Sequence, residues 1–306
     1  MINRFSRRSV LSAGLGLALA PRSAFASAAA KDELFGISLA QWSLHRTIGR
    51  GELDAFDFPK HAKEAFGISA VEYVSSFYSG MASDFAKLRS LKQRVDDCGS
   101  KSLLIMVDGE GHLGDSDESV RDRAVEQHFK WIAAARFLGC HAIRVNAHGD
   151  AEWAQRRDLA ANSLARLGRV GDEYQIDVIV ENHGGLSSNG KWLSETIVAA
   201  DHPRVGTLPD FGNFRIQGDE WYDRYQGIEE LMPHARAVSA KSNEFIEDGS
   251  EKHTDYERML RIVLDAGYRG HVGIEFEGGG ISEAEGIRAT KVLLERVRAK
   301  LTPEYS

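Results

Sequence analysis

The chain alternates short apolar segments with longer amphipathic ones over most of its length. The short segments are rich in Val, Ile, Leu and Phe, as buried strands are, and stretches of helical spacing lie between them. Strands are predicted at residues 35–44, 70–77, 102–108, 142–147, 177–182, 205–210, 235–241 and 271–276. The clearest helices are predicted at 119–138, 156–174, 194–200, 256–266 and 283–301.

The segment 119–138 illustrates the helical pattern. Val125, Phe129, Ile132 and Phe137 fall close to one face, and Gly139 follows where a C-cap glycine is typical. A repeated strand-then-helix order predicts an α/β protein with a single-domain (β/α)8 barrel, or TIM barrel, over residues 33–302. A doubly wound open sheet is the alternative, but no glycine-rich phosphate-binding motif follows a strand.

Composition and charge agree with a soluble globular protein. Charged residues make up 27% and hydrophobic residues 42% of the 306 positions, as in ordinary soluble domains. The net charge of −7 argues against a nucleic-acid partner, which would require a basic face.

The first 26 residues are predicted to be a signal peptide of the twin-arginine type. Arg7 and Arg8 precede an apolar run at 10–20, and Ala24-Phe25-Ala26 has the small-x-small form of a cleavage site. A membrane anchor is the alternative, but this run is too short to span a bilayer. The mature protein is therefore expected to be periplasmic or secreted, and free of the membrane.

The two cysteines, Cys98 and Cys140, each precede a predicted strand, and those strands are consecutive. In an oxidising compartment they form either a disulfide at the bottom of the barrel or two buried free thiols.

Polar residues gather at the carboxyl ends of the predicted strands, where the active site of such a barrel lies. These polar segments are 41–42, 72–73, 108–110, 144–149, 180–185, 208–214, 239–243 and 273–278. Side chains two residues apart on a strand share a face, which pairs Glu181 with His183, Ser239 with Lys241, Glu275 with Glu277 and Asn146 with His148.

Three acidic residues stand out because each lies at the end of an apolar strand. Glu181, Asp210 and Glu275 belong to the fifth, sixth and eighth predicted strands. A buried carboxylate costs free energy unless it is paired or metal-bound, and neighbouring carboxylates repel one another. A divalent metal with oxygen ligands (Mn, Mg, Co or Zn) is the simplest prediction for this cluster.

The motifs around these residues resemble the metal-binding strand ends of the xylose-isomerase-like sugar isomerases and epimerases. They read Val-Glu181-Asn-His, Asp210-Phe-Gly-Asn213 and Gly-Ile-Glu275-Phe-Glu-Gly, in the family's strand order, and the similarity covers nearly the whole mature chain. The resemblance implies that Glu181, Asp210 and Glu275 are three of four metal ligands. Asn213 stands where the family usually has a histidine.

The fourth ligand departs from the family pattern. The family's seventh strand reads His-x-Lys, whereas this chain has Ser239 in place of the histidine and keeps Lys241. The three carboxylates could hold the metal with water or Ser239, or His183 or His253 could fill the gap. Alternatively the metal is lost and Lys241 supplies the positive charge. We expect a retained but weaker metal site.

The resemblance also implies a function and a small carbohydrate substrate. In the family's chemistry Glu181 and Glu275 would take and return a proton on opposite faces of a substrate carbon, with Lys241 beside them. A keto-sugar lyase or hydratase is the first alternative, because elimination shares the first step. A non-catalytic sugar-binding barrel is the second. An endonuclease for abasic DNA would need more histidine ligands and a basic groove. A homo-oligomer is compatible with the sequence.

Substrate-binding roles are predicted for five further residues near the strand ends. Asn146, His148 and His183 are expected to bind substrate hydroxyls, with a supporting structural role as the alternative for His183. Trp42 is expected to stack on a sugar ring or simply to pack at the barrel mouth. Glu72 is expected to lie behind the metal ligands.

Overall fold

Eight parallel strands form the centre of the protein in the computed structural model, which describes residues 33–305. The strands are β1 (Gly36–Ala40), β2 (Ala70–Val74), β3 (Lys101–Met106), β4 (Ala142–Val145), β5 (Asp177–Glu181), β6 (Val205–Leu208), β9 (Val238–Ser242) and β10 (His271–Phe276). The predicted signal peptide at 1–26 lies outside the described residues.

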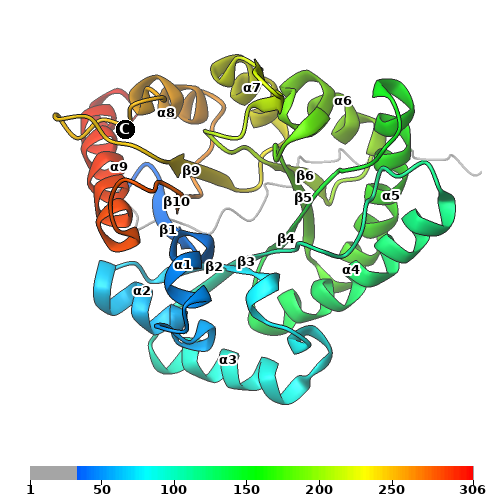
Figure 1. Cartoon of the computed structure of the whole chain (residues 1–306), viewed down its shortest axis with the longest axis horizontal. Coiled ribbons are helices and arrows are strands. Elements are labelled where there is room, and N and C mark those ends of the chain that lie inside the picture. The colour runs from blue at the N-terminus through cyan, green and yellow to red at the C-terminus, as the bar shows by residue number, and fades with distance from the viewer. Residues whose placement is uncertain (1–32, 306) are drawn as a thin grey trace, which may run out of the picture.

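The sheet closes on itself. Hydrogen-bonded neighbours follow the order β6-β5-β4-β3-β2-β1-β10-β9. Parallel bridges pair Thr207 with Ala235 and Asp210 with Ser239, and these join the end of β6 to the β9 segment. Figure 1 shows the helices arranged around the outside of the ring. The predicted (β/α)8 barrel is confirmed.

Helices follow the strands in turn. They are α1 (His45–Gly49), α2 (Phe58–Phe66), α3 (Phe85–Asp97), α4 (Glu118–Leu138), α5 (Trp153–Tyr174), α6 (Gly190–Ala200), α7 (Arg224–Leu231), α8 (Tyr256–Asp265) and α9 (Glu283–Tyr305). Short 3-10 helices are η1 (Gln41–Leu44), η2 (Ala55–Asp57), η3 (Ser75–Phe77), η4 (Met81–Ser83), η5 (Gly185–Ser188) and η6 (Met232–His234). A hairpin of β7 (Arg215–Gln217) and β8 (Glu220–Trp221) follows β6.

Side-chain caps fix where several helices begin. The carboxylates of Asp84, Asp117 and Asp255 accept hydrogen bonds from backbone N–H groups in the first turns of α3, α4 and α8. Gly139 ends α4 in the left-handed conformation, as predicted. Phe129 differs from the prediction, because it is exposed on α4 while Val125 and Ile132 are buried.

Several predicted strands are too long at the carboxyl end. The backbone leaves the sheet after Ala40 and after Val74, and η1 and η3 follow directly. The buried Gln41 side chain stabilises this exit, since its amide donates to the Tyr78 hydroxyl and accepts from the Val74 N–H. The apolar pattern continues beyond these points because the 3-10 turns also pack in the interior.

Cys98 and Cys140 are free thiols, but only Cys140 is buried, whereas Cys98 is partly exposed. Burial raises the pKa of the Cys140 thiol well above its ordinary value, so this thiol is unreactive at neutral pH.

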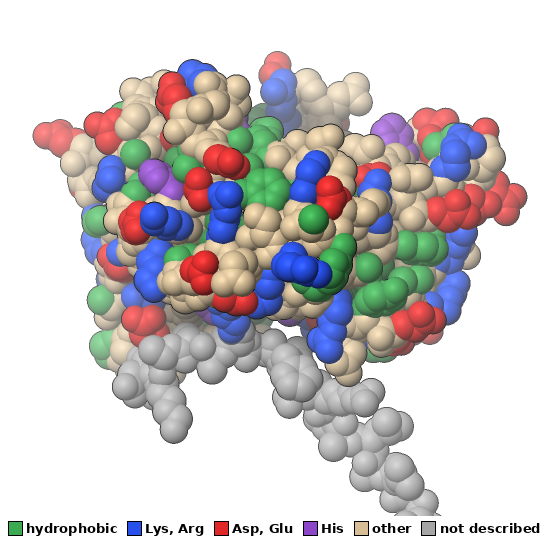
Figure 2. Space-filling view, turned by 90° about the horizontal axis from the view of Figure 1, so that it is seen from below, with side chains coloured by type: hydrophobic (Ala, Val, Ile, Leu, Met, Phe, Trp, Pro, Cys, Tyr) green, Lys and Arg blue, Asp and Glu red, His purple; other side chains and the backbone are tan. Residues whose placement is uncertain are grey.

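Lys and Arg side chains are interspersed with Asp and Glu on the face in Figure 2. Among residues 33–305, no helix combines the length and the apolar character that crossing a bilayer requires.

Candidate active site

The three predicted acidic residues converge at the carboxyl end of the barrel. Glu181 is the last residue of β5, Asp210 follows β6, and Glu275 lies near the end of β10. Each offers a carboxylate oxygen, and these three atoms all lie within 4.8 Å of one another. Their exposed fractions are 1%, 0% and 4%, so the cluster is shielded from bulk water. Such crowding in a low-dielectric interior requires compensating positive charge.

Arg144 supplies the first compensating charge. Its Nη1 donates to Asp108 Oδ1 at 2.7 Å, and its Nε lies 2.8 Å from Glu181 Oε2 in an orientation that makes no hydrogen bond. Burial raises the pKa of Glu181 to about 7, against the lowering effect of Arg144. Burial would also raise the pKa of Asp108, but Arg144 and Asn146 lower it below its ordinary value.

Lys241 on β9 supplies the second charge. Its Nζ lies 3.1 Å from Glu275 Oε1 and 3.0 Å from Glu277 Oε2, and it donates to Asn213 Oδ1 at 3.0 Å. Burial would lower the pKa of Lys241, but the surrounding carboxylates, Glu275 first, raise it above its ordinary value. Lys241 is therefore an ammonium ion, and Asn213 links it to the opposite wall by donating to Glu181 Oε1 at 2.9 Å.

Asp210 is held in one orientation by its own turn and by Ser239. Its Oδ1 accepts from the backbone N–H groups of Gly212 and Asn213 at 2.9 and 2.8 Å, and its Oδ2 accepts from the Ser239 hydroxyl at 2.6 Å. Burial raises its pKa to about 7, against the lowering effect of Lys241. The hydroxyl of Ser239 thus occupies one side of Asp210, at the position where the resemblance leads one to expect a histidine ligand.

Polar residues of intermediate exposure form a rim beside this cluster. Asn146 Nδ2 donates to Asp108 Oδ1 at 2.9 Å, and Asn146 Oδ1 lies 3.1 Å from His183 Nδ1. His148 Nε2 lies 2.9 Å from the His183 carbonyl, and the two rings stack. Burial and the nearby Arg144 lower the pKa of His183 to about 4, so its ring is neutral at pH 7. The three predicted substrate-binding residues on this side therefore form one group.

Trp42 lies on the other side of the mouth, in η1 rather than on a strand. Its indole N–H donates to Glu277 Oε1, and its ring stacks with those of His45 and Phe77. The ring is partly exposed. Trp42 thus orients Glu277, which in turn lies beside Lys241.

Glu72 lies below the rim, near enough to Glu275 and Glu181 for their charges to raise its pKa, and its predicted role behind the metal ligands stays a prediction. It is in the middle of the barrel, accepts from the Ser38 hydroxyl at 2.6 Å, and lines a cavity whose other walls are built by the amino-terminal ends of the strands. The space for its carboxylate exists because residue 273 is glycine, where a Cβ would lie 2.6 Å from Glu72 Oε1. Burial raises the pKa of Glu72 to about 7.

The buried carboxyl of Glu72 predicts a pH-dependent stability. Its pKa rises from 4.5 in the unfolded chain to about 7 in the folded one, so its favourable contribution is present below pH 4.5 and is lost as the pH rises to 7. Glu72→Gln should therefore stabilise the protein at pH 8 by on the order of 3 kcal/mol relative to its effect at pH 5. Urea unfolding at both pH values measures this, with the exposed Glu64→Gln as control. If Glu72→Gln changes the free energy of unfolding equally at pH 5 and at pH 8, the prediction is wrong.

No functional role was predicted from the sequence for three residues of the site. Asn213 and Glu277 both contact Lys241, and Asn182 braces the turn after β6 by donating to the Asp210 carbonyl and accepting from the Asp210 N–H. All three stand at strand ends. Glu277 also shares a face with Glu275, and this spacing could have identified it as a site residue. Their partners lie on other strands, so sequence spacing alone could not reveal the contacts.

The donor set fits a divalent cation. Glu181 Oε2 and Glu275 Oε2 are buried and have no hydrogen-bond partner among the described residues, a costly state that a bound cation would relieve. Together with Asp210 they present hard oxygen ligands of the kind that Mg²⁺ and Mn²⁺ prefer. Glu181, Asp210 and Glu275 would hold the ion. His183 and His253 are not among the residues whose ligand atoms converge there.

A family model described as xylose isomerase-like TIM barrel matches residues 59–297. The chain belongs to this family. No curated protein matches it in sequence. The barrel resembles many solved structures.

Three of these structures show the range of this likeness. A 3-keto-D-glucoside 4-epimerase from E. coli is 16% identical, with 86% of this chain and 99% of that chain covered and a TM-score of 0.66. A D-allulose 3-epimerase from Methylomonas sp. is 10% identical, with 87% and 98% covered and a TM-score of 0.67. A xylose isomerase-like barrel from Mycobacterium smegmatis, in complex with magnesium, is 15% identical, with 87% and 97% covered and a TM-score of 0.64.

Ser239 gives a direct test of the metal site. Ser239→His would place a nitrogen ligand beside Asp210 and should tighten Mn²⁺ binding by about tenfold or more, close to 1.4 kcal/mol. Titration calorimetry with Mn²⁺ measures this. Ser239→Ala, which removes the hydroxyl without adding a ligand, is the control. Equal affinities for the histidine and alanine variants would show that residue 239 does not face the ion.

Proposed function

We propose that this protein is a sugar isomerase or epimerase that moves a proton between Glu181 and Glu275 on a ketose or keto-sugar. The observation that carries the proposal is the convergence of three buried carboxylates from three strands, two of them with an oxygen that accepts no hydrogen bond from the described residues. The structurally similar proteins named as epimerases of 3-keto-D-glucosides and D-allulose support the same substrate class. Export by the predicted signal peptide would favour a free sugar or glycoside over a phosphorylated metabolite.

The positions of the two carboxylates suit a reaction at one carbon. Glu181 and Glu275 come from β5 and β10, which are separated around the ring by β6 and β9, so they approach the mouth from different sides. In one direction Glu275 takes the proton from the substrate carbon and Glu181 returns one, and the roles reverse in the other direction. A pKa of about 7 lets Glu181 serve as acid or base near neutral pH.

Positive charge beside the reacting atoms is the second requirement. The Lys241 ammonium is fixed beside Glu275 by Asn213 and Glu277, and there it would stabilise negative charge that develops on a substrate oxygen. A divalent cation held by Glu181, Asp210 and Glu275, when bound, would supply Lewis-acid polarisation of a substrate carbonyl and its neighbouring hydroxyl. The rim residues Asn146, His148 and His183 would bind further hydroxyls.

Solvent isotope exchange tests the proposal. The protein, incubated in D2O with Mn²⁺ and either D-fructose or a 3-keto-D-glucoside, should introduce deuterium at a carbon next to the carbonyl and form the epimer. NMR detects both. The double variant Glu181→Gln/Glu275→Gln should do neither.

The same experiment separates the alternatives. An unsaturated product with a new ultraviolet absorbance would identify a keto-sugar lyase. Sugar binding without exchange would identify a non-catalytic barrel, and either result would overturn the proposed isomerase.

A further inference from the structure

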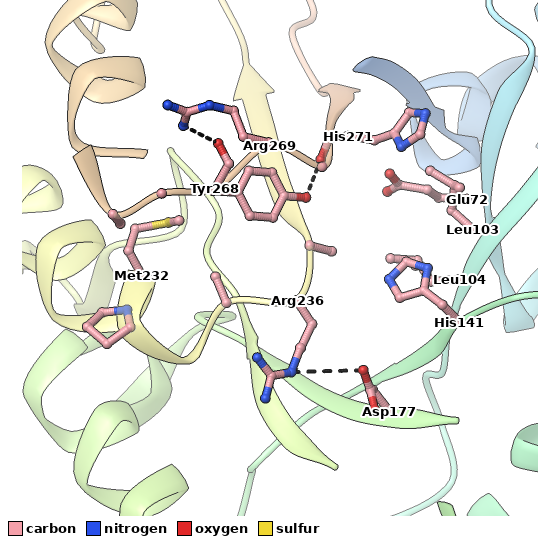
Figure 3. Close-up of a pocket in the computed structure, with 16 residues that line it drawn as sticks. Glu72, Leu103, Leu104, His141, Asp177, Met232, Arg236, Tyr268, Arg269 and His271 are labelled. Carbon is pink, nitrogen blue, oxygen red and sulfur yellow. Dashed lines mark hydrogen bonds and ion pairs between the residues drawn. The ribbon is translucent and has the colours of Figure 1, made fainter. Parts of the chain in front are cut away.

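A cavity lies at the opposite end of the barrel from the carboxylate cluster. Its volume is about 360 Å³, within the range of small-molecule sites. Residues just before or at the start of β4, β5, β9 and β10 build its walls, including His141, Asp177, Arg236 and His271. Glu72 reaches it from β2. Figure 3 shows Glu72 and His141 on one side of the cavity, with Tyr268 opposite.

The cavity contains polar groups that the protein leaves unsatisfied. His141 Nε2 is buried and has no hydrogen-bond partner among the residues that the structure describes. Burial lowers the pKa of His141, so the ring is neutral and can donate or accept. A buried polar atom of this kind costs free energy unless a ligand or a water molecule forms a hydrogen bond with it.

The cavity also contains a loosely held positive charge. Arg236 Nε lies 3.9 Å from Asp177 Oδ2, and its Nη2 donates to the Pro203 carbonyl over 3.4 Å. Asp177 has a closer partner, because Arg204 Nη1 donates to its Oδ1 at 3.1 Å. Arg204 also pairs with Asp172, 3.1 Å from its Nε, so it does not neutralise Asp177 alone. Both contacts of Arg236 are nevertheless long, and its guanidinium therefore has donors available for an anion.

We propose that this cavity is a second binding site, for a small hydroxylated organic carboxylate of the sugar-acid type. The ligand carboxylate pairs with Arg236, and its hydroxyl groups meet His141 Nε2 and the Glu72 carboxyl. Leu103, Leu104 and Met232 line the cavity and contact the carbon chain. No residue of the carboxylate cluster lines this cavity, so binding there can be tested separately from the proposed isomerase chemistry.

The experiment uses D-gluconate as the probe and D-glucose as its uncharged counterpart. Calorimetry with the purified protein should show gluconate binding at least about tenfold tighter than glucose, the contribution of one charge-assisted pair. Arg236→Gln should weaken gluconate binding by a similar factor, whereas the exposed Arg50→Gln should leave it unchanged. The imidazole NMR signal of His141, assigned with His141→Asn, should shift on addition of gluconate.

The double variant Glu181→Gln/Glu275→Gln separates the two sites. It should bind gluconate like the unaltered protein while losing isotope exchange. Gluconate binding that disappears in this variant would place the ligand at the carboxylate cluster and overturn the second site. The second site would also be overturned if gluconate did not bind, if glucose bound with equal affinity, or if Arg236→Gln left gluconate binding unchanged.

Discussion

Glu181→Gln and Glu275→Gln are each expected to lower kcat by about 10²–10⁴-fold, the usual contribution of a positioned acid or base. Glutamine keeps the size of the side chain and can still accept the Asn213 hydrogen bond at position 181. It cannot take or return a proton. The loss should therefore appear in turnover rather than in folding.

Isotope exchange sharpens this prediction. Because each carboxylate serves one side of the carbon, a variant that retains one of them should still exchange deuterium into one epimer more readily than into the other. Steady-state kinetics together with NMR of each epimer measures this asymmetry. Glu244→Gln, an exposed acid paired with Lys252, is the control and should leave both measurements unchanged. Full turnover in both site variants would show that other groups move the proton.

The position of the site could be predicted from the sequence for a simple reason. In a parallel barrel all carboxyl ends meet at one rim, so Glu181, Asp210 and Glu275 needed only correct strand assignment to be brought together. Errors of a few residues in strand length did not matter there. Asp210 still converges with the others although β6 ends two residues earlier.

The depth of Glu72 in the barrel could not be predicted in the same way. The strand was expected to run through residues 70–77 but ends at Val74, and the Glu72 side chain points inward below the rim. Which layer of the barrel a side chain fills depends on its neighbours across the sheet, here Ser38 and Gly273. Sequence spacing within one strand contains no such information.

The ion pairs of Arg144 could not be predicted from sequence spacing either. This side chain contacts Glu181 in the site and also forms a salt bridge with Asp108. Asp108 and Glu181, its partners, belong to neighbouring segments on either side of β4. Only the register of three strands brings these groups to within hydrogen-bond distance.

Arg144→Met is accordingly expected to destabilise the protein by about 3–5 kcal/mol at pH 8, since it leaves two carboxylates without their cation in a site where Arg144 itself is only 4% exposed. The effect should be smaller at pH 5.5. Glu181, with a pKa of about 7 in the folded protein, is protonated there and no longer needs a partner. Asp108, whose pKa is lowered, remains charged at both pH values, so part of the loss persists.

Urea unfolding in EDTA at the two pH values measures the effect of Arg144→Met, because EDTA removes any cation that could replace the lost charge. Arg166→Met is the matched control. It removes an arginine from a largely exposed pair with Asp122 and should cost less than about 1 kcal/mol at either pH. Equal losses for the two variants would mean that Arg144 does not compensate the buried cluster. The crowding of Glu181, Asp210 and Glu275 would then have to be relieved by a shared proton or by Lys241 alone.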